Sequence, residues 1–372
     1  MAARATRTEG GRRAVVRRRA WLLFGSIIGL AICVLIALFV VPSSHRVKVV
    51  RVIAKPAALP RPTIASADGT PAAPLAPDPQ SVGASVGAAA SGRQSSVAAG
   101  AAKTPASSLL ATGAKASFAR LQQSFGDHVE LAILPLGGDG QVETLGGDVA
   151  AHGWSTMKVP VLVALLRARG ARGLTSSEQL WARAAITESD NESILELFGD
   201  LERLHGGLLG ASRFVQQLFR LSGDTQTTVS TAAPPAGAVT TFGQTEWSPG
   251  EAVKFFRELG RGCLLAPAQT GYVLSLMQSI EPSESWGLGS AGFDSVAFKG
   301  GWGPEVSGGY LVRQSGIVDV GTSRAAAVAI VALPSGGSSS FAAGTEVLDR
   351  TSAWLRQTLR LRSGVQGGCA GE

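Results

Sequence analysis

Residues 153–169 read GWSTMKVPVLVALLRAR and place a long apolar run directly behind a serine and a lysine. The spacing of the apolar residues predicts a helix over 159–169. Pro160 fits the first turn of that helix, where a proline needs no backbone partner. Similar spacing predicts further helices at 178–186, 192–203, 212–221, 249–259 and 267–280. The middle of the chain is therefore predicted to be helical.

Strand-like segments flank this helical middle on both sides. Before it, residues 128–136 and 141–147 alternate around a glycine-rich turn and predict a β-hairpin. After it, the sequence predicts strands within 295–301, 308–318 and 324–333, and then a closing helix at 345–361. Strands from both chain ends around a helical insert predict an α+β sandwich whose antiparallel sheet is shared by the two ends.

Residues 21–41, WLLFGSIIGLAICVLIALFVV, form an uncharged apolar run that is long enough to cross a hydrocarbon layer of about 30 Å as one helix. Seven arginines lie before this run, which favours an N-terminus on the cytoplasmic side. We therefore expect a basic cytoplasmic tail at 1–20, a single transmembrane helix at 21–41 and an extracytoplasmic remainder in the cell membrane.

Residues 42–113 are rich in Ala, Pro, Ser and Gly and contain no aromatic residue. Such a segment cannot bury enough apolar surface to offset the entropy that ordering costs. We expect a disordered linker at 42–113, a folded domain at 114–363 and a flexible tail at 364–372.

The distribution of charge excludes a nucleic-acid partner. The chain has a formal net charge of +7, but its first 61 residues alone carry +11, so the remainder is mildly acidic. A domain of that sign offers no basic surface to phosphates. The basic residues therefore serve membrane orientation.

Cysteine and histidine offer no metal chemistry. Cys33 lies within the apolar run, and Cys263 and Cys369 either pair or stay free. The four histidines lack the spacing of metal ligands, and we expect neither a metal nor a cofactor.

Three short motifs carry polar groups suited to catalysis. Ser155 and Lys158 are three apart at a predicted helix start and so share one face, where a partly desolvated lysine can act as a base. Ser189-Asp190-Asn191 lies between two predicted helices, and Lys299-Gly300-Gly301 ends a predicted strand. Each motif alone also fits a structural role, as a helix cap, a helix stop or a strand end.

Taken together and in this order, the motifs resemble the signature elements of class A β-lactamases and penicillin-binding proteins. The resemblance covers about residues 115–362 and implies a β-lactamase-like sandwich with an acyl-enzyme mechanism. It implies that Ser155 attacks an amide or lactam carbonyl and that Lys158 accepts or relays the serine's proton. Ser189 would then pass the proton towards the leaving nitrogen.

The resemblance also implies a set of substrate contacts. Asn191 would hold the substrate's amide, and Lys299 would attract a substrate carboxylate. Backbone N–H groups of Ser155 and Trp302 would form an oxyanion hole. Gly301 would let the ligand approach the strand. The substrate is expected to be a small molecule or peptide, either a β-lactam or a cell-wall peptide.

Two departures from the family pattern leave the activity open. The family's deacylating Glu has no counterpart, because residues 224–248 hold acids only near their edges, at Asp224 and Glu246. Gly300 stands where the family prefers a hydroxyl. Efficient β-lactam turnover is therefore doubtful. The alternative to a serine hydrolase is a non-hydrolytic or slowly deacylating module that binds penicillin or peptidoglycan peptides.

Overall fold

The computed structural model describes residues 109–126, 128–138, 140–147, 151–334, 339–360 and 369. The predicted tail at 1–20, the transmembrane helix at 21–41 and the linker as far as residue 108 lie outside these ranges. Within the ranges, no helix is long and apolar enough to span a membrane.

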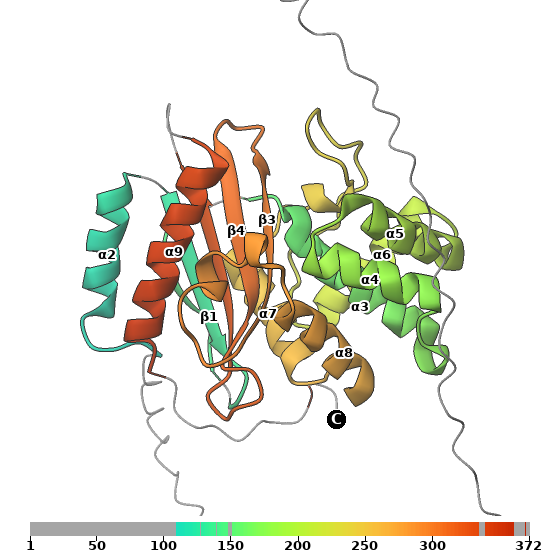
Figure 1. The fold of residues 1–372 in the computed structure, drawn as a ribbon, viewed down its shortest axis with the longest axis horizontal. Coiled ribbons are helices and arrows are strands. Elements are labelled where there is room, and N and C mark those ends of the chain that lie inside the picture. The colour runs from blue at the N-terminus through green and yellow to red at the C-terminus, as the bar shows by residue number, and fades with distance from the viewer. Residues whose placement is uncertain are drawn as a thin grey trace, which may run out of the picture. The chain divides into compact units, whose positions relative to one another are not determined.

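A five-stranded antiparallel sheet in the order β2-β1-β5-β4-β3 forms the framework of the domain (Figure 1). β1 (His128–Pro135) lies between β2 (Glu143–Gly146) and β5 (Ala326–Leu333). β4 (Tyr310–Val318) joins β5 to the edge strand β3 (Val296–Pro304). The two N-terminal strands and the three C-terminal strands thus share one sheet, which confirms the predicted arrangement.

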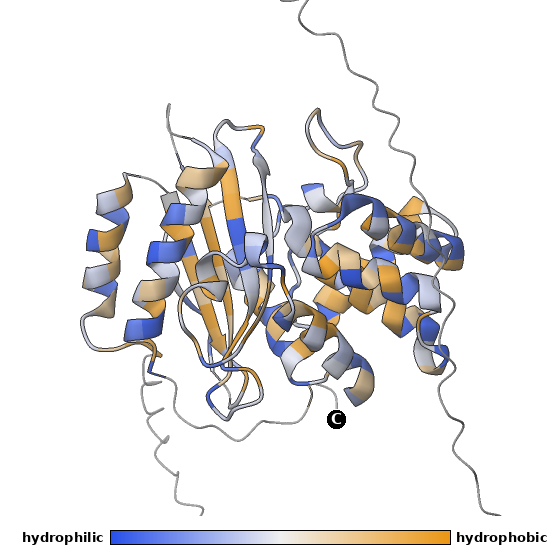
Figure 2. Ribbon diagram, in the orientation of Figure 1, coloured by the Kyte–Doolittle hydropathy of each residue, from blue (hydrophilic) through white to orange (hydrophobic). Residues whose placement is uncertain are grey.

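Helices cover both faces of the sheet (Figure 1). On one face, α9 (Phe341–Thr358) and α2 (Ala114–Phe125) contribute Leu348 and Phe118 to a core with Val328 of β5. Apolar side chains of the other face pack against the helical insert. The central strands are accordingly hydrophobic along most of their length (Figure 2), as expected for strands buried on both sides.

The insert contains the six predicted helices, with ends that differ from the predictions by up to four residues. They are α3 (Lys158–Arg169), α4 (Ser176–Thr187), α5 (Asn191–His205), α6 (Leu208–Leu221), α7 (Pro249–Gly260) and α8 (Pro267–Gln278). Short 3₁₀ turns connect the elements: η1 (Trp154–Met157), η2 (Gly170–Arg172), η3 (Phe242–Gln244), η4 (Pro282–Glu284) and η5 (Gly287–Gly289).

Two terminal helices differ from the sequence predictions. α9 begins at Phe341 rather than at 345, because the Ser340 hydroxyl accepts the Ala343 N–H at 3.2 Å and caps an earlier turn. α2 was not predicted. Its N-cap is a glycine without a side-chain cap, so no polar capping signal marks its start.

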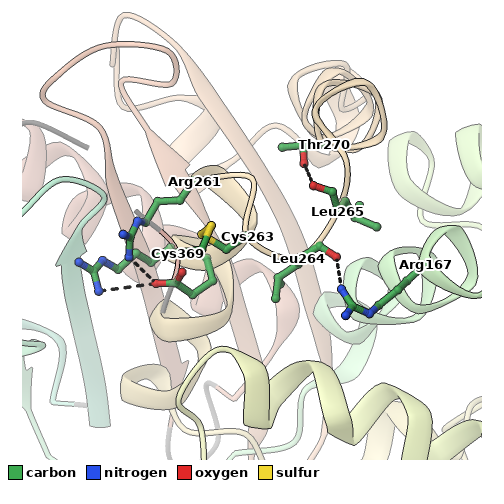
Figure 3. The surroundings of a disulfide bond; sticks show 9 residues. Arg167, Arg261, Cys263, Leu264, Leu265, Thr270 and Cys369 are labelled. Atoms are coloured by element: carbon green, nitrogen blue, oxygen red, sulfur yellow. Dashed lines mark hydrogen bonds and ion pairs between the residues drawn. A yellow bond between two sulfur atoms is a disulfide. The ribbon is translucent and has the colours of Figure 1, made fainter. Parts of the chain in front are cut away.

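A disulfide joins Cys263 to Cys369, with a Cα–Cα distance of 5.3 Å, which resolves the pairing that the sequence left open. Cys263 lies in the loop between α7 and α8 (Figure 3). The same loop is fixed to α3, because Arg167 Nη1 donates to Leu264 O at 2.9 Å. Cys369 is therefore covalently attached to the helical insert.

Candidate active site

The predicted nucleophile lies in a short turn that is largely buried. Ser155 belongs to η1 and is half-buried, whereas Trp154 and Thr156 on either side are buried. Trp154 has a φ of 46°, which non-glycine residues seldom adopt. Backbone strain of this kind persists where the surroundings impose it, and it concentrates at functional sites. The turn is anchored by Gly153 N–H, which donates to Thr245 O at 2.7 Å.

Lys158 begins α3 and is only 1% exposed. The residues that follow it in this helix, as far as Leu166, are also buried. Its Nζ donates to the main-chain oxygen of Ser189, to Ser189 Oγ at 3.3 Å and to Asp190 O at 3.3 Å. Burial, assisted by the positive charge of Lys299, lowers the pKa of Lys158 to about 7. A lysine with that pKa is partly uncharged at neutral pH and can accept a proton.

Ser189 connects the two buried lysines of the site. Its Oγ lies 2.9 Å from Lys299 Nζ and 3.3 Å from Lys158 Nζ. Ser189 has a φ of 57°, so a second strained residue lies at the same place. The backbone is fixed there by Asp190, which caps α5 by accepting the Ser193 N–H at 2.7 Å. The hydroxyl is thus held between the side-chain nitrogen atoms of Lys158 and Lys299.

Lys299 is fully buried on β3. Besides Ser189, its Nζ contacts Glu284 Oε2 at 3.1 Å and Gly300 O at 3.2 Å. Burial lowers the pKa of Lys299, and the carboxylate of Glu284 opposes that effect. Hydrogen bonds therefore join Lys158, Ser189 and Lys299, which come from α3, from the loop before α5 and from β3.

Gly301 lets β3 lie directly against the nucleophile turn. A Cβ at position 301 would lie 2.9 Å from Ser155 N, 3.0 Å from Thr156 N and 3.1 Å from Gly153 O. Only a residue without a side chain fits against these three backbone atoms. Gly301 therefore brings the strand edge to the backbone N–H of the predicted nucleophile.

The two remaining predicted residues lie beside this network without hydrogen-bonding to it. Asn191 is the first residue of α5 and its side chain is exposed. Trp302 is half-buried and packs against Trp286 and Phe341, with ring centroids 6.1 and 5.1 Å away. Trp286 also occupies the space above Gly300, where a Cβ would lie 2.9 Å from the indole ring.

Sequence reasoning missed Glu284, the carboxylate that pairs with Lys299. It comes from η4, in a loop of Pro, Ser and Glu that shows no periodic pattern, and its partner is 15 residues away. The only available signal was one acidic residue in the loop before the strand that carries Lys299, which is too common to be specific.

A second unpredicted pairing supports the nucleophile turn. Glu305 Oε2 lies 2.5 Å from His152 Nδ1, and Glu305 Oε1 accepts the indole N–H of Trp154 at 3.0 Å. Glu305 follows β3, so this contact is a further link between that strand and η1.

Among the described residues, no group of three or more His, Cys, Asp or Glu side chains is arranged to hold a metal ion.

Comparison with known proteins identifies the architecture. No known family model matches the chain, and no curated protein matches its sequence. Solved structures do match. A chromosome-encoded β-lactamase of Vibrio parahaemolyticus shares 14% identity with a TM-score of 0.52, covering 66% of this chain and 98% of that one.

Two further β-lactamases match over a similar extent. The class A enzyme of Mycobacterium abscessus is 16% identical, with a TM-score of 0.51 and coverage of 66% and 98%. A β-lactamase from Burkholderia vietnamiensis is 19% identical, with a TM-score of 0.50 and coverage of 66% and 96%. The described domain has the fold of the class A β-lactamases.

Proposed function

We propose that this chain is a serine acyl-transferring hydrolase that forms an acyl-enzyme at Ser155 on amide or lactam substrates. The observation that carries the proposal is Lys158. It is buried three residues after the serine, its pKa is about 7, and it is hydrogen-bonded to a second hydroxyl, that of Ser189. A buried lysine is costly for a fold to keep, so its presence beside a strained serine turn favours a chemical role.

The proposed reaction begins at Ser155 Oγ, which bonds to the substrate carbonyl carbon while its proton passes to Lys158 Nζ. The carbonyl oxygen becomes an oxyanion beside the backbone N–H of Ser155, with Trp302 N–H as the second donor. Such donors contribute about 3 kcal/mol each to transition-state stabilisation. The C–N bond then breaks, and the proton moves from Lys158 through Ser189 Oγ to the leaving nitrogen.

The test is an intact-mass time course of the full chain in detergent with benzylpenicillin and, separately, with an uncharged activated ester. We expect an adduct of one acyl group that is absent from Ser155→Ala. Ser176→Ala, which removes an exposed hydroxyl from the start of α4, is the matched control and should keep the adduct. An adduct that survives in Ser155→Ala, or no adduct with either reagent, contradicts the proposal.

A second candidate function is a penicillin- or peptide-binding module that deacylates slowly. It is favoured by the surroundings of Asp224 and Glu246, the two acids that border residues 225–245, because neither is placed as the family's deacylating Glu. Asp224 is buried and its Oδ1 accepts the N–H groups of Gln226 and Thr227, at 3.0 and 2.9 Å, so it has a structural role. Glu246 is exposed. In the same time course, an adduct that persists for hours supports this module, whereas one that decays supports the hydrolase.

We further propose that residues 21–41 anchor the chain in the cell membrane with the domain outside the cytoplasm. The uncharged apolar run supports the anchor. The Cys263–Cys369 disulfide supports the location, because such bonds persist in oxidising compartments. Deleting residues 1–41 should move the chain out of the membrane fraction. Protease added to intact spheroplasts should degrade the full-length domain, and a protected domain contradicts the topology.

A further inference from the structure

The buried ammonium of Lys299 has no hydrogen-bond donor left for a substrate. A lysine ammonium carries three N–H donors. Three acceptors lie within hydrogen-bond distance of Lys299 Nζ: Ser189 Oγ at 2.9 Å, Glu284 Oε2 at 3.1 Å and Gly300 O at 3.2 Å. A substrate carboxylate could bind this lysine only by displacing one of them.

The charge of Lys299 is also neutralised. Its side chain is 0% exposed and that of Glu284 is 14% exposed, so little solvent screens the pair. Lys158 offers no substitute. Its contacts are Ser189 and the main-chain oxygen of Asp190, and it is partly uncharged at neutral pH. A carboxylate that approached this end of the site would lose hydration and would meet a neutral ion pair rather than an unpaired lysine.

The neighbouring surface is aromatic. Trp286 covers Gly300, and it packs edge to face on Trp302 and Phe341 with centroids 6.1 and 5.7 Å away. Trp286 and Trp302 are half-buried, and Phe341 is 36% exposed. We call these three residues the aromatic cluster. It adjoins Gly300 of β3, whereas Gly301 faces the nucleophile turn. A substrate that lies along the edge of this strand and extends past Gly300 would therefore contact rings rather than charged groups.

We infer that Glu284 and the aromatic cluster select acyl donors that have no carboxylate beside the scissile bond, so that the substrate is uncharged and apolar where it faces Trp302. This inference rests on the proposed function of Ser155 and reverses the role that the family resemblance implied for Lys299. Glu284 is then a specificity-determining residue, because it neutralises Lys299 and occupies one of the lysine's three donors.

The test compares benzylpenicillin with its methyl ester, two reagents that have the same acyl group and differ in one carboxylate. Acylation of the full chain in detergent is followed by intact mass, and each rate is divided by the reagent's rate with hydroxide. The ester should acylate Ser155 about tenfold faster than the acid, since a carboxylate that is desolvated without a cationic partner costs at least that much. Glu284→Gln should remove most of this preference by accelerating the acid.

Glu281→Gln is the matched control, because it removes a carboxylate three residues away in the same loop. The backbone N–H of Glu281, rather than its side chain, donates to Thr187 O, so the substitution keeps this bond. It should leave the ratio of the two rates within about twofold. An acid that reacts faster than the ester, or a ratio unchanged in Glu284→Gln, overturns the inference and leaves the Ser155 acyl-enzyme intact. Failure of both reagents to acylate Ser155 overturns the proposed function, and this inference with it.

Discussion

The rate of the proposed acylation should depend on the protonation state of Lys158. Below pH 7 its amine is mainly charged and cannot take the Ser155 proton, and above pH 7 it is mainly neutral. The acylation rate should therefore rise with pH, reach half its maximum near pH 7 and then level off. Intact-mass rates between pH 5 and 9 measure this profile. A rate that does not change across pH 7 would argue against Lys158 as the base.

The midpoint of that profile should move in opposite directions in two variants. The charge of Lys299 lowers the pKa of Lys158, whereas the carboxylate of Glu284 raises it. Lys299→Met should therefore shift the midpoint above pH 7, and Glu284→Gln should shift it below. Shifts of the same sign in both variants would show that these charges do not set the pKa of Lys158.

Replacing Lys158 should stabilise the fold while abolishing acylation. Its pKa is lowered in the folded state, so the charged form is disfavoured there relative to the unfolded chain. This penalty is fully present below pH 7 and shrinks as the pH rises from 7 towards 10.5. Lys158→Met should raise the free energy of unfolding at pH 6 by about 2 kcal/mol, and by less at pH 9. Thermal unfolding at both pH values measures the difference. A loss of stability at pH 6 would mean that the hydrogen bonds of Lys158 outweigh the cost of burying it.

At the scale of elements, the site depends on how closely β3 approaches η1. In Gly301→Ala the new methyl group would press on the backbone of Ser155 and Thr156, which cannot move without displacing the nucleophile. Acylation should fall about 100-fold, the loss expected when catalytic groups are misplaced by about 1 Å. Gly271→Ala is the control, because its Cβ would meet nothing within 4 Å on α8. Equal acylation rates in the two variants would contradict the close approach.

The elements predicted from sequence are those with a local signal. Apolar periodicity located the helices of the insert, and alternation located the strands. The three motifs pointed to Ser155, Lys158, Ser189 and Lys299, which lie in adjacent segments of the fold. The Lys299–Glu284 pair and the placement of Trp286 over Gly300 arise when separate segments pack together, so no local pattern encodes them. α2 was missed because its first turn has neither a polar cap nor an acidic residue.

At the scale of the whole molecule, the disulfide closes a long loop. Cys263 and Cys369 are 106 residues apart, so the bond restricts a large part of the unfolded chain. The double variant Cys263→Ser/Cys369→Ser should lose about 2–4 kcal/mol of unfolding free energy. Thermal unfolding with and without reductant measures the loss. Reductant should destabilise the natural chain and Cys33→Ser equally, and it should leave the double variant unchanged. A natural chain insensitive to reductant would contradict the bond.

The strand order also determines when the proposed site can form during synthesis. β1 pairs with β5, yet the whole helical insert and three further strands (β2, β3 and β4) separate them along the chain. A β1–β2 hairpin alone is marginally stable in water, so a growing chain that already contains Ser155 still lacks most of its sheet. β3, which brings Gly301 to the nucleophile turn, is held in the sheet only through β4 and β5. The proposed site around Ser155 is therefore complete only after β5 has joined the sheet, and a nascent chain that ends before β5 lacks the contact between Gly301 and the nucleophile turn.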